Sequence, residues 1–225
     1  MKLTLVSSCG VLMESEGQKL LVDGVNEPCL TFQVFPEEDL TGIKNGAAPY
    51  DGLLALLFTH RHPDHYSEPR LSAIVTERPQ LPILTPEDTA SDNVSFRIGC
   101  FEIEAKTVAH TPVPGVECPK HMVYLITTPE GSVYFSADAD IDVELQRRFL
   151  RGRIVDYGFF NGQYLSHPET RAFLGECFKH QLIYHIPVDK EDFTGIRRKA
   201  DNNYERYSAE LPSLLLLNRY PYPIL

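Results

Sequence analysis

Four residues that can bind metal stand close together in the segment LLFTHRHPDHY, residues 56–66. An apolar run leads into His60 and His62, which are two residues apart at the end of an expected strand. In extended backbone their imidazoles point to the same side and can share one ion. The proline that follows breaks the strand, so Asp64 and His65 can turn toward a neighbouring position and hold a second ion. Imidazole and carboxylate together suit Zn²⁺, Mn²⁺ or Fe²⁺.

Three residues further along the chain could complete such a site. His110, Asp138 and His185 each follow an expected strand. Ligands carried at strand ends gather at one edge of a sheet. Each residue alone is a weak signal, because a histidine at a strand end is commonly a surface or capping residue. Their occurrence together with the first cluster makes them candidate ligands.

The elements that must position these residues are mainly strands at first and alternating strands and helices later. We expect strands at residues 2–7, 11–15, 19–23, 53–59, 82–85, 94–98, 101–108, 122–127, 132–136, 154–159, 181–184 and 214–217, and helices at 67–78, 140–150, 168–180 and 189–210. Residues 25–50 are irregular, with room for a short helix, and loops of this length often border a site. This order predicts an α+β fold of two packed sheets covered by helices.

The composition is that of an ordinary globular protein, with 43% hydrophobic and 23% charged residues among 225. That length allows one substantial core, and we expect a single domain over residues 1–225. The net charge of −10 argues against an extended nucleic-acid footprint. No apolar run reaches membrane-spanning length. Five scattered cysteines and the lack of a signal-peptide pattern favour a cytoplasmic protein.

The motifs THRHPDH, VAHT, VYFSADAD and LIYHIP, in this order, resemble the metallo-β-lactamase fold superfamily. The opening MKLTLVSSCGVLMESEGQKLLVDGV also resembles the first hairpin of that superfamily, in which a strand ending in Asp approaches the site. The resemblance covers roughly residues 1–190. It implies a four-layer αββα sandwich with two metal ions at one edge.

The resemblance also implies how the candidate ligands divide between the two ions. The first ion would be held by His60, His62 and His110, the second by Asp64, His65 and His185, and Asp138 would bridge them. One departure concerns the residue before the bridging aspartate, which is usually Gly in the family and is Ala137 here. Because Gly permits a tighter backbone, Asp140 stays open as an alternative bridge.

Two such ions can share a hydroxide and activate it as the nucleophile, while they polarise the oxygen of the substrate. Asp64 could orient this nucleophile or accept its proton. Two divalent ions are therefore the expected cofactors, with Zn favoured and Mn or Fe as alternatives. His121 and Tyr164 flank the ligand-bearing segments, and of the remaining side chains we expect these two nearest the pocket.

The chain looks most like the small UlaG-like or ribonuclease Z-like members, which act on phosphodiesters, lactones or related esters. A hydrolase acting on a small molecule is the favoured function. A nuclease acting on RNA or DNA is an alternative, although the nearest basic segment, residues 195–207, has the mixed charge of a solvated helix. A non-catalytic metal-binding protein is a further alternative, and a homo-oligomer is possible. Specificity is expected to lie in loops at residues 25–50 and 157–168.

Overall fold

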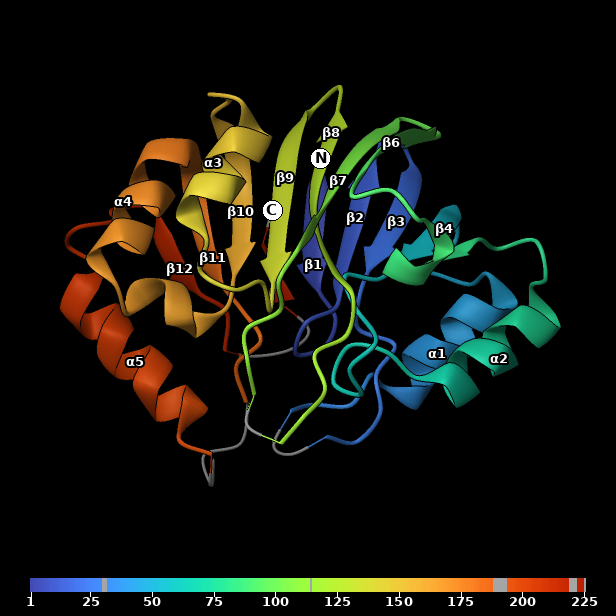
Figure 1. The fold of residues 1–225 in the computed structure, drawn as a ribbon. Helices are drawn as coiled ribbons and strands as arrows, with labels where there is room; N and C mark the ends of the chain where they lie inside the picture. Colours follow the sequence, from blue (N-terminus) through green and yellow to red (C-terminus); the bar gives the residue numbers. More distant parts are fainter. Residues whose placement is uncertain (30–31, 114, 188–193, 219–221, 225) are drawn as a thin grey trace.

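Two β-sheets lie face to face, and helices cover their outer faces (Figure 1). The computed structural model describes residues 1–29, 32–113, 115–187, 194–218 and 222–224. Three apolar clusters fill the spaces between the layers. This is the four-layer αββα arrangement that the sequence predicts. Across the described ranges, every helix is too short or too polar to cross a membrane.

The first sheet has the strand order β13-β1-β2-β3-β4-β5. Its strands are β1 (Lys2–Leu5), β2 (Val11–Ser15), β3 (Gln18–Val22), β4 (Leu53–Leu57), β5 (Ile83–Leu84) and β13 (Tyr222–Pro223). The first three form the expected meander, whereas β4 runs parallel to β3 and β5. The short C-terminal strand β13, which sequence reasoning missed, pairs with β1.

The second sheet has the order β12-β11-β10-β9-β8-β7-β6. Its strands are β6 (Asn93–Ile98), β7 (Phe101–Val108), β8 (His121–Thr128), β9 (Gly131–Ala137), β10 (Val155–Phe160), β11 (Phe178–Ile183) and β12 (Leu214–Leu216). Strands β6 to β9 pair antiparallel, and β9 to β12 pair parallel. Strands β7, β9 and β11 therefore end at the same edge of the sheet.

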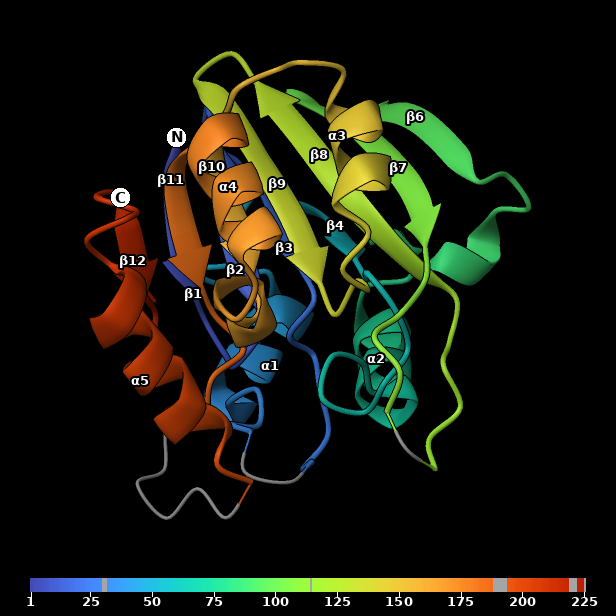
Figure 2. The ribbon, with the colours of Figure 1, turned by 60° about the vertical axis from the view of Figure 1, so that its left-hand side comes forward.

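Five α-helices within the described ranges form the outer layers. They are α1 (Glu37–Asn45), α2 (Glu68–Glu77), α3 (Val143–Leu150), α4 (Pro168–Cys177) and α5 (Ile196–Tyr207). Helices α1 and α2 cover the first sheet, and α3, α4 and α5 cover the second (Figures 1 and 2). Two begin at side-chain caps, since Ser67 accepts from the backbone N–H of Arg70 and Asp142 from that of Leu145.

Two expected helix boundaries are wrong. The helix predicted to run to His180 ends at Cys177, and Phe178 begins β11 directly. The apolar pattern at these residues is compatible with either a helix or a strand. Phe178 adopts the strand because it pairs in parallel with Val155 of β10. The polar helix predicted at 189–210 spans Ile196–Tyr207, and residues 188–193 lie outside the described ranges. The short helix expected within residues 25–50 is α1.

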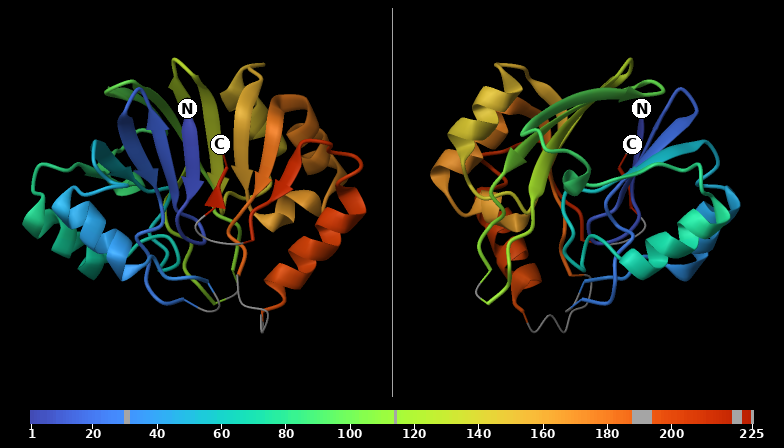
Figure 3. Two further views of the ribbon diagram at one scale, coloured as in Figure 1. Left: turned by 180° about the vertical axis from the view of Figure 1, so that it is seen from behind. Right: turned by 45° about the vertical axis from the view of Figure 1, so that its right-hand side comes forward.

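The loops beneath the sheets meet by very close backbone packing. A Cβ atom added at Gly24 would lie 2.4 Å from the Cα of Gly10, and Gly24 has a φ of +94°. Only glycine fits such a position. The loop that follows β1 can therefore lie against the loop that follows β3, at the edge where the ligand-bearing strands end (Figure 3).

The inter-sheet core depends on stacked aromatic rings, which gives a stability test. Phe159 is fully buried, and its ring stacks on Phe135 with centroids 4.9 Å apart. We expect Phe159→Ala to lower the free energy of unfolding by about 3–5 kcal/mol in urea denaturation. Phe96→Ala, on the partly exposed edge strand β6, should cost less than half as much. Equal losses in the two variants would contradict this assignment of the core.

Candidate metal centre

All seven predicted site residues meet at one edge of the two sheets. They follow β4, β7, β9 and β11 as expected: His60, His62, Asp64, His65, His110, Asp138 and His185. Backbone hydrogen bonds tie these loops together across the sheets. Met122 N donates to Thr59 O at 2.9 Å, and His185 N donates to Ser8 O at 2.8 Å. The centre is thus built on strand ends that are fixed to one another.

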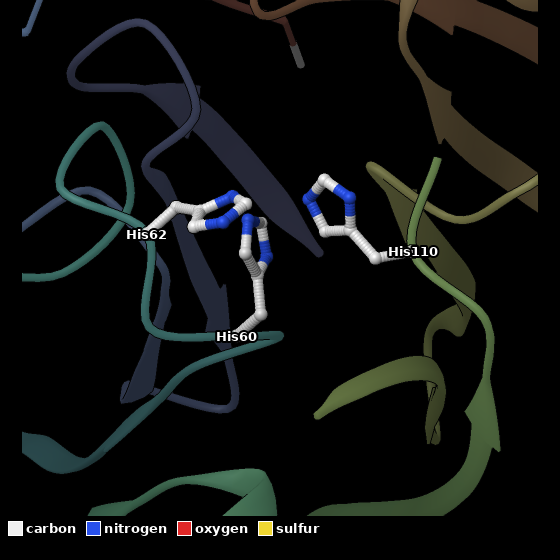
Figure 4. A group of neighbouring side chains, drawn as sticks. All are labelled: His60, His62 and His110. Atoms are coloured by element: carbon white, nitrogen blue, oxygen red, sulfur yellow. The ribbon is translucent and has the colours of Figure 1, made fainter. Parts of the chain in front are cut away.

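The first donor group consists of His60, His62 and His110 (Figure 4). One possible ligand atom from each side chain lies within 4.8 Å of the other two. His60 and His110 are buried, whereas His62 is partly exposed. Figure 4 shows the three imidazoles facing a common space from two separate segments of the chain. This spacing is suitable for three ligands of one ion.

The second donor group consists of Asp64, His65, Asp138 and His185, with the same 4.8 Å limit between ligand atoms. His65 and His185 are buried. Asp64 Oδ2 lies 3.1 Å from His185 Nε2, and Asp138 Oδ1 lies 3.4 Å from His185 Nδ1. Two carboxylates and two imidazoles form a donor set of the kind that divalent transition metals take.

Asp138 lies between the two groups. Its Oδ2 is 3.8 Å from His60 Nε2, 3.4 Å from His65 Nε2 and 3.9 Å from His110 Nε2. Asp140 belongs to neither donor group, and its Oδ1 accepts from the backbone N–H of Ile141. The geometry therefore favours Asp138 over Asp140 as the residue shared by both groups.

Ala137 shows why a glycine suits the position before this aspartate. Its φ is +44°, in the left-handed region that residues with a Cβ adopt only with strain. His185 and Asp23 also have positive φ values, of 58° and 54°. Strained backbone of this kind clusters at functional sites, where the surrounding structure holds it in place.

Asp23 and Thr59 contact the Nδ1 atoms of His65 and His60, on the side of each ring opposite to Nε2. Asp23 Oδ2 lies 3.1 Å from His65 Nδ1 and accepts the Thr59 hydroxyl at 2.7 Å. Thr59 Oγ1 in turn lies 3.0 Å from His60 Nδ1. With protons on both Nδ1 atoms, Nε2 of His60 and of His65 faces the centre as a free ligand atom. The first-hairpin resemblance pointed to Asp23, but no sequence signal marked Thr59.

The other first-group histidines use their ring nitrogens differently. His110 Nδ1 lies 2.6 Å from the Thr111 carbonyl oxygen, which leaves Nε2 directed toward Asp138. His62 Nε2 lies 3.1 Å from the Glu117 carbonyl oxygen, so Nδ1 is the nitrogen that is left for a ligand. Backbone carbonyls thus fix the tautomers of His62 and His110.

Charges in the centre are strongly coupled. Burial opposes ionisation of Asp138, but His185 and His65 outweigh it and hold the pKa of the carboxyl well below its usual range. Burial likewise opposes protonation of His185, yet Asp138 and Asp64 raise its pKa to about 9. The pKa of His60 is lowered well below its usual value by burial and by His65. Without metal, protonated His65 and His185 balance the carboxylates.

The unpartnered imidazole nitrogens of the two donor groups are consistent with metal binding. Nε2 of His60, of His65 and of His110 is buried, and each lacks a hydrogen-bond partner in the described part of the chain. Buried nitrogens are rarely left without a partner. Three such atoms around one carboxylate oxygen fit divalent cations.

Two nearby residues differ from expectation. Tyr164 does not reach the centre, because it is buried under α5 and accepts a hydrogen bond from Gln146 Nε2 at 2.7 Å. Phe32, which carried no recognisable signal, stacks on His185 with ring centroids 4.1 Å apart. Phe32 lies in the loop expected to set specificity.

Comparison with known families identifies the superfamily. The model of the beta-lactamase superfamily domain matches residues 2–154, which include the residues from His60 to Asp138. The chain belongs to the beta-lactamase superfamily. No curated protein sequence matches the chain.

Solved structures of this superfamily fold align along the whole chain at low sequence identity. The metallo-beta-lactamase fold protein YhfI from Bacillus subtilis has a TM-score of 0.63 and 16% identity, covering 99% of this chain and 98% of its own. A possible metal-dependent hydrolase from Veillonella parvula has a TM-score of 0.69 and 10% identity, covering 100% and 98%. An isothiocyanate hydrolase from Delia radicum gut bacteria has a TM-score of 0.64 and 13% identity, covering 100% and 99%. These similarities establish the fold.

A substitution at Asp23 tests whether its hydrogen bond to His65 contributes to metal affinity. Asp23→Asn keeps the size of the side chain but removes the charge that fixes the His65 tautomer. We expect metal affinity to fall 10–100-fold, measured by competition with a chromophoric chelator. Asp51→Asn is the matched control, because Asp51 pairs with Lys19 away from the centre. Unchanged affinity in Asp23→Asn would show that Asp23 does not support the site.

Proposed function

We propose that this chain is a hydrolase that uses two divalent metal ions, with zinc favoured, to cleave an ester-type bond in a small molecule. The observation that carries the proposal is the position of Asp138. One of its carboxylate oxygens lies within 3.9 Å of imidazole nitrogens from both donor groups. A carboxylate shared between two sets of ligands is the arrangement expected of a bridging residue.

The residues divide between two roles. His60, His62 and His110 would hold one ion, and Asp64, His65 and His185 the other. When bound, such a pair of ions lowers the pKa of a water and polarises the reacting oxygen of a substrate. Asp64 is only partly buried, so its carboxylate can also orient the attacking water or accept its proton. The buried rings of His60 and His65 keep bulk water from the inner side of the centre.

Substrate contacts are expected from two loops that border the centre. The first contains Phe32, which stacks on His185. The second follows His110 and carries Val113 and Val116, which are 44% and 48% exposed. Exposed apolar side chains beside a polar centre suit a substrate with an apolar part. A small phosphodiester, lactone or other ester, as in UlaG-like enzymes, fits these features better than an extended polyanion, because the net charge is −10.

A substrate screen tests the proposal. Protein loaded with Zn²⁺, Mn²⁺ or Fe²⁺ would be assayed with phosphodiester, lactone and thioester substrates, and with an isothiocyanate because one structural neighbour is an isothiocyanate hydrolase. We expect hydrolysis of one class, its loss on chelation and its return with metal. Asp138→Ala should lower kcat/KM at least about 100-fold, since it removes the bridging carboxylate.

The controls separate metal chemistry from folding. Asp140→Ala should keep metal content and activity close to those of the unchanged protein, because Asp140 lies outside both donor groups. Full activity in Asp138→Ala would overturn the two-ion proposal. Cleavage of RNA or DNA with tight, steeply salt-dependent binding would instead favour the nuclease alternative.

A further inference from the structure

His121 lies beside the first donor group without belonging to it. It opens β8 and pairs in register with Val108, two residues before His110. The backbone N–H of the next residue, Met122, donates to the carbonyl of Thr59, immediately before His60. Hydrogen-bonded backbone thus fixes the position of His121 relative to both buried first-group ligands.

The rings of His60 and His110 have an imidazole neighbour on each of two sides. Their own centroids are 4.8 Å apart. The ring centroid of His62 lies 5.0 Å from that of His60 and 4.5 Å from that of His110. The ring centroid of His121 lies 4.9 Å from that of His60 and 5.6 Å from that of His110. By ring centroids, the trio completed by His121 is nearly as compact as the trio completed by His62, although the donor group defined by ligand-atom distances contains only His62.

His121 is the imidazole with the least satisfied ring. Its side chain is fully buried, and neither ring nitrogen has a hydrogen-bond partner in the ranges that the structure describes. By contrast, His60 has Thr59 and His110 has the Thr111 carbonyl at Nδ1. A buried polar group left unpaired costs about 1–3 kcal/mol, so a ring with two such atoms calls for a ligand.

His62 is more exposed to solvent than His121. It is partly open to solvent, and its Nε2 contacts the carbonyl of Glu117 in the loop that carries Val113 and Val116. His121 is fully buried and opens β8, directly after the loop.

We infer that His121 is a reserve imidazole ligand: an ion held by His60 and His110 takes its third imidazole from either His62 or His121. This inference rests on the metal centre of the proposed function. It assigns to His121, which is buried, the task of retaining the ion when the partly exposed His62 leaves it. A position on the solvent side then opens for substrate while the ion keeps three protein ligands.

Metal titration of four proteins tests this assignment. Metal-free unchanged protein, His62→Ala, His121→Phe and the double variant would be titrated with Co²⁺, following its visible d–d spectrum and competition with a chelator. Each single variant should keep first-ion affinity within about threefold of the unchanged protein, whereas the double variant should lose at least about 100-fold. Such an excess over the sum of the single effects is the signature of two ligands that replace each other. Additive effects, or an unaltered affinity on adding His121→Phe to His62→Ala, would overturn the inference.

A second measurement does not depend on the double variant folding. In ¹⁵N-labelled His62→Ala, addition of Zn²⁺ should shift one ring nitrogen of His121, assigned through the loss of its signal in His121→Phe. An unshifted ring would overturn the inference. The matched control is His62→Ala with His180→Phe, because His180 stacks on Tyr157 in β10 and β11, away from the centre, and should leave Co²⁺ affinity at the His62→Ala value. If the unchanged protein binds fewer than two ions, the two-ion function fails, and that result is separate from the behaviour of His121.

Discussion

The negative charge of Asp138, whose side chain is only 16% exposed, is the constraint on which the centre depends. A carboxylate withdrawn from water requires nearby positive charge or several hydrogen-bond donors. Here imidazole nitrogens on three sides lie 3.4–3.9 Å from one of its oxygens. In the metal-free state, protonated His65 and His185 supply the balancing charge, which agrees with the raised pKa of both rings. Divalent ions would replace those protons, so metal binding and proton release are coupled.

The architecture serves to bring these groups to one point. Strands β3 and β4 of one sheet and β7, β9 and β11 of the other all end at the same edge. Hydrogen bonds between the loops then fix the distances, and strained backbone at Asp23, Ala137 and His185 aims the side chains. Phe135 and Phe159, which stack as neighbours on β9 and β10, belong to the apolar cluster that joins the two sheets. Stability of the core and geometry of the site are therefore parts of one arrangement.

Much of this could be predicted from sequence, because metal ligands require particular residue types at particular strand ends. The spacing of His60, His62, Asp64 and His65 predicted four of the seven candidate ligands. Strand ends, together with the resemblance to the superfamily, predicted the other three. The support from Thr59 could not be predicted, since a threonine beside a histidine has many common uses. The same applies to Phe32, whose contact with His185 depends on a loop without periodicity. The exchange of helix for strand at Phe178 was missed because tertiary pairing, rather than local propensity, decides it.

The most direct test of the account is a crystal structure of metal-loaded protein with anomalous scattering data collected at the absorption edge of the bound metal. We predict two anomalous peaks roughly 3.5–4 Å apart, with the carboxylate of Asp138 between them. One peak should have His60 and His110 as ligands, and the other His65 and His185. A single peak, or two peaks bridged by Asp140 instead, would contradict the central claim.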